Sequence, residues 1–161
     1  MAPNLAIVSI PAYFIFSLVP HTYAVGIAAK GNIATLDNRN PRSTTFIDSL
    51  RQKLTPDEFA RYERCESAHK NNLESFPLFA SAVLAGLLAD GVGKGGVLTG
   101  EVAGKGTLRF VYSWFAVRTL FNVLYISTSN NKYTWIRSAV FFAGVGLAAQ
   151  QFWRAAQILG A

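Results

Sequence analysis

The stretch from Arg61 to Leu88 reads RYERCESAHKNNLESFPLFASAVLAGLL and changes from a charged surface to a hydrophobic segment within about three helical turns. Residues three, four and seven apart share one face of a helix. One such stripe runs from water into an apolar environment and comprises Ser67, Asn71, Glu74 and Leu78. A carboxylate and an amide carried into a hydrophobic segment need partners, because burying them unpaired costs free energy. We therefore expect the rest of the chain to supply these partners.

The composition favours a membrane protein. Of the 161 residues, 51% are hydrophobic and 15% are charged, whereas soluble domains are roughly 25% charged. The net charge of +6 suits nucleic acid or an anionic membrane surface. The basic residues alternate with acidic ones and form no nucleic-acid-binding motif, so we expect no nucleic-acid partner. A single cysteine, Cys65, excludes an internal disulfide.

Residues 5–29 contain no Lys, Arg, Asp or Glu. A run of this length is enough to cross the hydrocarbon core, which takes about 20 helical residues. A cleaved signal peptide is the competing interpretation, but the run has no basic segment before it and is too long. We predict a transmembrane helix, in which His21 is a hydrogen-bonding group. No metal site is predicted, because His21 has no second ligand-type residue placed beside it.

The second helix is predicted over residues 56–89, after a polar connection at 30–56. Thr55 is a typical N-cap, followed by Pro56 at the first helical position and by Asp57 and Glu58 in the first turn. The apolar part of this helix is short, so the helix starts in water and enters the bilayer near Glu74.

Two more helices are predicted, over residues 108–129 and 134–159. Residues 90–107 are rich in glycine and predict a loop. Arg118 lies in the middle of the third apolar segment, where an ionisable residue is by default a functional or interhelical pairing group. Small residues in the last helix permit close approach of a neighbouring helix.

Together these segments predict one all-α domain over residues 1–161, a four-transmembrane-helix up-down bundle. A soluble helical bundle is the alternative, and the uninterrupted first segment argues against it. Eight Lys/Arg lie in the connection at 30–72, whereas nothing basic precedes Lys30. The excess of basic residues in cytoplasmic loops therefore places both termini on the non-cytosolic side.

The run ERCESAHKNNLESFPLF, Glu63 to Phe79, resembles the signature of the MAPEG proteins, the membrane-associated proteins of eicosanoid and glutathione metabolism. A second similar region comprises Arg118, Tyr125 and the pair Arg137-Ser138. The length, the four-helix layout and the inferred orientation are also similar to those of the family.

The resemblance implies a trimer that binds glutathione as co-substrate at the cytosolic side of the subunit interfaces, together with a lipophilic small molecule and membrane lipid. It also implies an endoplasmic-reticulum location. The implied glutathione-binding residues are Lys70, Asn71, Glu74, Arg118, Tyr125 and Ser138. Arg137 is the implied catalytic residue. An arginine beside the sulfur lowers the thiol pKa and so favours the reactive thiolate.

The sequence departs from the family pattern at two positions, where Ser67 and Gly31 replace expected arginines. Simpler roles also stay open for the implied site residues. Glu74 and Arg118 can form an interhelical ion pair, Asn71 can be an interhelical hydrogen-bonding residue, and Tyr125 and Arg137 can be interfacial anchors.

Three functions follow as hypotheses. The first is a glutathione-dependent transferase or peroxidase that acts on lipophilic electrophiles. The second is a non-catalytic lipid-binding or scaffold protein that resembles 5-lipoxygenase-activating protein. The third is an unrelated assembly factor in which the polar stripe only specifies helix pairing. The sequence identifies neither the electrophile nor the pathway.

Overall fold

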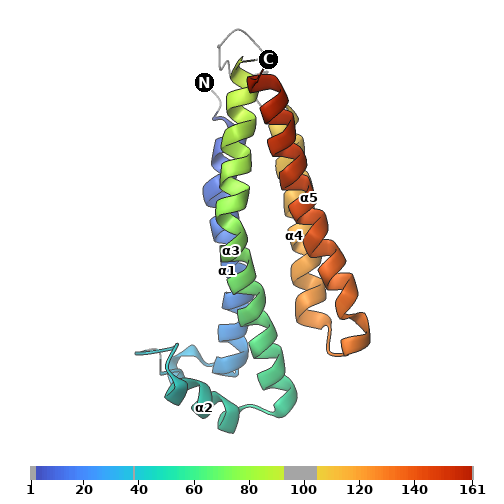
Figure 1. Ribbon diagram of the computed structural model, residues 1–161. Coiled ribbons are helices and arrows are strands. Elements are labelled where there is room, and N and C mark those ends of the chain that lie inside the picture. Colours follow the sequence, from blue (N-terminus) through green and yellow to red (C-terminus); the bar gives the residue numbers. More distant parts are fainter. Residues whose placement is uncertain (1–2, 38, 93–104, 161) are drawn as a thin grey trace.

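The computed structural model describes residues 3–37, 39–92 and 105–160, and in these ranges the chain has helices and no strands (Figure 1). The all-α prediction is confirmed. Four long helices lie side by side: α1 (Leu5–Ala29), α3 (Pro56–Val92), α4 (Lys105–Ser127) and α5 (Thr134–Leu159). The short helix α2 (Thr44–Lys53) and two 3₁₀ turns, η1 (Ile33–Thr35) and η2 (Asn131–Tyr133), lie at the end opposite the labelled termini.

Helix α1 has the bounds predicted from the absence of charge. The side chain of Asn4 accepts hydrogen bonds from the backbone N–H groups of Ala6 and Ile7 and so caps the helix. The helix continues through Pro11 and Pro20. It ends at Lys30 in the left-handed region, with φ of 48°, and the next residue is Gly31 at φ of 84°.

Helix α3 begins at the predicted capping residues. The Thr55 N–H donates to Glu58 Oε2 at 2.8 Å, and the Glu58 N–H donates to Thr55 Oγ1 at 3.3 Å. These reciprocal bonds form a capping box, which fixes the start of the helix. Its 37 residues span about 55 Å, well beyond the ~30 Å of a hydrocarbon core. The charged first half therefore extends out of any bilayer that the second half crosses.

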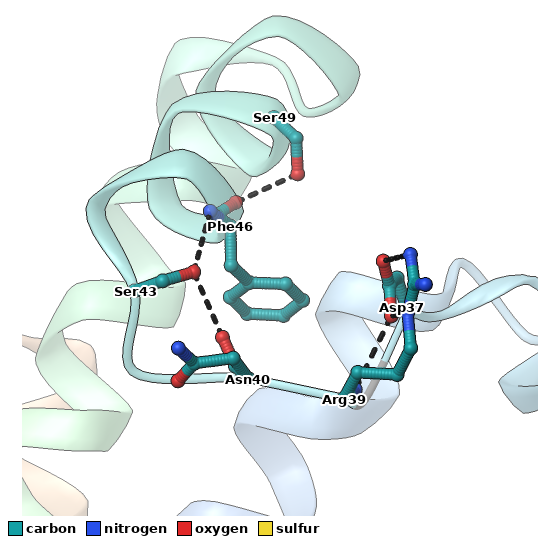
Figure 2. Close-up of polar contacts among 6 residues, drawn as sticks. All are labelled: Asp37, Arg39, Asn40, Ser43, Phe46 and Ser49. Atoms are coloured by element: carbon teal, nitrogen blue, oxygen red, sulfur yellow. Dashed lines mark hydrogen bonds and ion pairs between the residues drawn. The ribbon is translucent and has the colours of Figure 1, made fainter.

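Helix α2 was not predicted, and the interpretation of residues 30–56 as a polar connection is wrong at this point. Figure 2 shows its start, where Ser43 Oγ accepts from the Phe46 N–H at 3.1 Å and donates to the Asn40 carbonyl at 2.9 Å. Phe46 and Leu50 are buried, and the other face is polar. Two buried side chains in a short, polar segment are too few to reveal from the sequence a helix that is stabilised by packing.

The predicted glycine-rich loop at 90–107 lies partly outside the described residues. At its two ends the structure has helix instead, because α3 extends to Val92 and α4 begins at Lys105. The third predicted helix is thus shifted by a few residues toward the N-terminus, whereas α5 has the predicted bounds.

Aromatic side chains fill the core between α1, α3 and α4. The Tyr13 ring lies 4.8 Å from the Phe79 ring, and Phe79 lies 5.4 Å from Trp114. All three side chains are buried. Large offset and edge-on aromatic contacts of this kind stabilise packing beyond simple area burial, so the three helices are held in a defined register.

A polar network joins α3, α4 and α5 close to the labelled C-terminus. Asp90 pairs with Arg154 and accepts a hydrogen bond from Thr107 Oγ1 at 2.7 Å, and Gln151 Nε2 donates to Thr107 Oγ1 at 3.3 Å. Gly86 makes this approach possible, because a Cβ atom there would lie 1.8 Å from Gln151 Nε2. This network fixes the end of the bundle that is opposite α2.

Two of the helices, α1 and α3, are long and apolar enough to cross a membrane, each with a mean hydropathy of 1.6 over its most apolar stretch. Large apolar side chains also face outward on all four long helices, among them Ile15, Leu88, Val123 and Phe142. Outward apolar faces on an otherwise packed bundle are expected where lipid or another subunit covers them.

Candidate functional site

Arg118 occupies the interior of the bundle. The residue is 2% exposed, and its Nη2 donates to Asn71 Oδ1 and to Asn72 Oδ1, each at 2.7 Å. The guanidinium also lies 4.5 Å from the centre of the Phe121 ring. No ion pair between Glu74 and Arg118 is found among the described residues, so that alternative for the two residues is wrong. Asn71, in contrast, is the interhelical hydrogen-bonding residue that the second alternative described.

Two buried amides extend this network and were not singled out in the sequence. Asn72 Nδ2 donates to Asn122 Oδ1 at 3.1 Å, so each of α3 and α4 contributes amides to the bonds around Arg118. The sequence signal for these two residues was an amide side chain next to an apolar run in each helix. Which side of the helix each amide occupies depends on packing, which the sequence pattern does not give.

A small cavity of about 150 Å³ borders this network between α3, α4 and α5. Its lining includes Asn71, Glu74 and Arg118, together with Trp114 and Phe141. Drug-sized ligands occupy sites of about 300–1,000 Å³. The small cavity is therefore suited to a few waters or to one functional group of a larger ligand.

A much larger cavity of about 910 Å³ lies between α1, α2 and the first half of α3. Lys70 and Glu74 line it, one helical turn apart, and Ser67 lies on the same wall. Glu74 also lines the small cavity, so it stands between the two spaces. Of the polar stripe noted in the sequence, Ser67 and Glu74 thus line the larger of these two cavities, and Asn71, Glu74 and Leu78 line the small one.

Two histidines tie α1 to α3 at this cavity. His21 Nδ1 lies 2.7 Å from Glu66 Oε1, and His69 Nδ1 lies 2.7 Å from the Ser17 carbonyl oxygen. A carbonyl oxygen can only accept, so His69 Nδ1 carries the proton and Nε2 is its free acceptor when the ring is neutral. These bonds fix the wall of the cavity, and His21 is a hydrogen-bonding group as predicted.

Tyr125 and Arg137 lie away from both cavities. The Arg137 guanidinium lies 4.2 Å from the centre of the Tyr125 ring, which is a cation–π contact between α4 and α5. Ser138 is exposed, and its hydroxyl donates to the Thr134 carbonyl at 3.4 Å. Neither cavity has any of these three residues in its described lining.

Within a single chain, the predicted site residues thus fall into three separate groups. Asn71, Glu74 and Arg118 meet at the small cavity, Lys70 joins Glu74 at the large one, and Tyr125 pairs with Arg137. Among the motif residues outside this set, Arg64 has a structural contact: its Nε donates to the Ile126 carbonyl at 2.9 Å, near the end of α4.

Comparison with known proteins supplies one match. A family model described as the MAPEG family matches residues 7–157, which is nearly the whole chain. Comparisons with curated proteins and with solved structures gave no match.

Proposed function

Because this chain belongs to the MAPEG family, we propose that it is a glutathione-dependent membrane transferase or peroxidase that acts on lipophilic electrophiles. One observation carries the proposal. Lys70 and Glu74 lie one turn apart on the wall of the 910 Å³ cavity, and the described residues offer no hydrogen-bond or ion-pair partner to either. A cation beside an anion matches the carboxylate and ammonium of an amino-acid group such as the γ-glutamyl end of glutathione.

The proposed chemistry requires a thiolate close to a fixed positive charge. Arg137 stabilises the glutathione thiolate in this proposal, because a guanidinium next to sulfur favours the ionised form and stays charged at any physiological pH. Tyr125 holds the guanidinium through the cation–π contact, and Ser138 offers a hydroxyl beside it. Asn71 and Arg118 line the small cavity that continues from Glu74.

The reaction with an electrophile is an addition or a reduction. In conjugation the S–H proton leaves to solvent, the sulfur lone pair forms a bond to carbon, and the displaced electron pair of the electrophile takes up a proton. In reduction two glutathione molecules and one hydroperoxide give the disulfide, the alcohol and water. In either reaction the lipophilic electrophile reaches the protein through the bilayer.

The proposed assembly is a homotrimer of four-span subunits. The described lining of the large cavity comes from α1, α2, α3 and the chain between them. Arg137 and Tyr125 on α5 and α4 therefore approach such a cavity from a neighbouring copy. In this arrangement the outward apolar residues of α4 and α5 contact lipid or the neighbouring subunits. We further propose an endoplasmic-reticulum location with both termini non-cytosolic, because the basic connections lie at the end opposite the termini.

The test is turnover by the purified wild-type protein in liposomes, with glutathione and either a long-chain α,β-unsaturated aldehyde or a lipid hydroperoxide. Glutathione-dependent loss of either electrophile above the uncatalysed rate is expected. A rate equal to that of empty liposomes with both electrophiles would overturn the enzymatic proposal.

A second function is favoured by one feature of the cavity. Ser67 lines the large cavity where the family pattern has an arginine, which leaves the wall of α3 with one cation fewer. A non-catalytic lipid-binding or scaffold protein that resembles 5-lipoxygenase-activating protein needs no such charge. Saturable binding of a fluorescent fatty acid without binding of glutathione would favour this alternative.

A further inference from the structure

Arg42 is a cation in the lining of the large cavity that the sequence patterns did not single out. It lies directly before Ser43, the N-cap of α2, and it lines the cavity together with Phe46 and Ile47 of that helix. The side chain is exposed, and none of the described residues forms an ion pair or a hydrogen bond with it. The cavity lining therefore includes two cations that have no partner among the described residues, Lys70 on α3 and Arg42 before α2.

Two other basic residues of this connection, Arg39 and Lys30, are already paired. Arg39 binds Asp37 with two side-chain hydrogen bonds, at 2.9 Å from Nε and 2.8 Å from Nη2 (Figure 2). These bonds hold the pKa of the Asp37 carboxyl at about 2, so the pair stays ionised at physiological pH. Lys30 Nζ lies 3.4 Å from Glu58 Oε2. Arg42 is thus the basic residue of this connection that both lines the cavity and has no partner among the described residues.

Three glutamates line the cavity. Glu66 is engaged by His21, whereas Glu63 and Glu74 have no partner among the described residues. Of these two, Glu74 is the one that stands one turn from Lys70. Glu74 and Lys70 together fit one amino-acid group of a ligand, with its ammonium and its carboxylate side by side. A second carboxylate, at the far end of the ligand, then needs a second cation.

The size and lining of the cavity agree with an extended ligand. Its volume of about 910 Å³ is at the upper part of the usual range for small-molecule sites. Apolar side chains make up much of the remaining lining, including Leu18, Val25, Leu36 and Leu73. A ligand with charged ends and a less polar middle is complementary to this arrangement.

We propose that Arg42 binds the glycine carboxylate of glutathione and takes over the charge that Ser67 does not provide, while Lys70 and Glu74 bind the γ-glutamyl end. This inference rests on the proposed function, because it assumes that glutathione is the co-substrate. A guanidinium binds a carboxylate through two parallel hydrogen bonds, which makes Arg42 selective for a free carboxylate over an ester. Arg42 is a ligand-positioning residue here and takes no part in proton transfer.

The test compares two ligands on three proteins. Glutathione and its glycine monoethyl ester, in which an ethyl ester replaces that carboxylate and removes its charge, are titrated into the full-length wild type, Arg42→Ala and Arg39→Ala. The wild type is expected to bind glutathione about tenfold more tightly than the ester, as is usual for a hydrogen bond between charged groups. Arg42→Ala should lose this preference, because its affinity for glutathione falls while its affinity for the ester stays the same. Arg39→Ala should retain the preference, because Arg39 lies outside the cavity lining.

The outcomes separate the inference from the function on which it rests. If the wild type binds neither ligand, the proposed function fails, and the inference fails with it. If the wild type binds glutathione and Arg42→Ala keeps the wild-type preference, or weakens both ligands equally, the inference is overturned and the proposed function stands. Arg42→Lys should restore part of the preference, which a purely structural role of Arg42 would not require. Equal thermal unfolding midpoints of the three proteins confirm that the exposed substitutions leave the fold intact.

Discussion

The guanidinium of Arg137 lies over the ring of Tyr125, with 4.2 Å between Cζ and the ring centre. Tyr125 in turn contacts Phe121, with 5.5 Å between the ring centres. The charge of Arg137 is therefore positioned by the Tyr125 ring, which is itself packed against the Phe121 ring of the same helix. A fixed charge stabilises a thiolate better than a mobile one, because no reorganisation is needed when the charge on sulfur develops.

Replacement of Arg137 should separate turnover from binding. We expect Arg137→Ala to lower kcat about 100-fold or more, the usual loss when one charge-stabilising donor is removed from an active site. The glutathione dissociation constant should change far less, because the γ-glutamyl end is bound elsewhere. Steady-state kinetics and calorimetry on the same preparation measure the two quantities. A large increase in the dissociation constant with unchanged kcat would contradict the role of Arg137.

Replacement of Glu74 should weaken glutathione binding and leave turnover nearly unchanged, which is the opposite of the effect expected for Arg137→Ala. Glu74→Gln removes the charge that binds the ammonium of glutathione and keeps the size of the side chain. We expect the dissociation constant to rise about tenfold or more, in line with the loss of a charge-assisted hydrogen bond, with kcat at saturating glutathione nearly unchanged. The matched control is Asp57→Asn at the exposed start of α3, which should bind glutathione as the wild type does. If the wild type, Glu74→Gln and Asp57→Asn bind glutathione with equal affinity, Glu74 is not part of the glutathione site.

Arg118 should be required for stability. Arg118→Ala leaves the amide oxygens of Asn71 and Asn72 without their donor and opens a void in the core. The combined cost is about 2–5 kcal/mol, which corresponds to a fall in Tm of roughly 5–15 °C for a chain of this size. Thermal unfolding in detergent measures the effect, and Arg109→Ala, on an exposed position of α4, serves as the control. Similar midpoints for both variants would show that the Arg118 network contributes little.

The polar network at the other end of the bundle gives a prediction at Gly86. A methyl group there would lie 2.6 Å from Thr107 Oγ1 and 1.8 Å from Gln151 Nε2, so both buried side chains must move. We expect Gly86→Ala to destabilise the protein by about 1–3 kcal/mol. In Gly146→Ala the methyl group meets no atom within 4 Å, and the gain in helix propensity is up to about 1 kcal/mol. The two variants should therefore shift Tm in opposite directions, and a stabilised Gly86→Ala would contradict the close approach of α3 and α5.

Much of the fold could be predicted because local signals were strong. The absence of charge over Leu5–Ala29 gave the bounds of α1, and the residues Thr55 to Glu58 gave the start of α3. Helix α2 was missed because its stability depends on Phe46 and Leu50 packing against the rest of the protein. Such packing leaves little trace in a short, polar segment.

The candidate site could be predicted only in part. Helical periodicity placed Asn71 and Glu74 on one stripe, and the structure puts both at the small cavity. Periodicity does not reveal what lies across from a stripe. For this reason the pairing of Arg118 with two amides was missed, and so was Arg42, which reaches the large cavity from a connection with no periodic pattern.

Calorimetric titration of glutathione into the detergent-purified wild-type protein, with ultraviolet absorbance of the thiolate recorded under the same conditions, tests the central claim most directly. The account predicts saturable binding together with a thiolate signal, and it predicts that Arg137→Ala binds glutathione without that signal. Absence of saturable binding at millimolar glutathione would contradict the account and would favour the lipid-binding alternative.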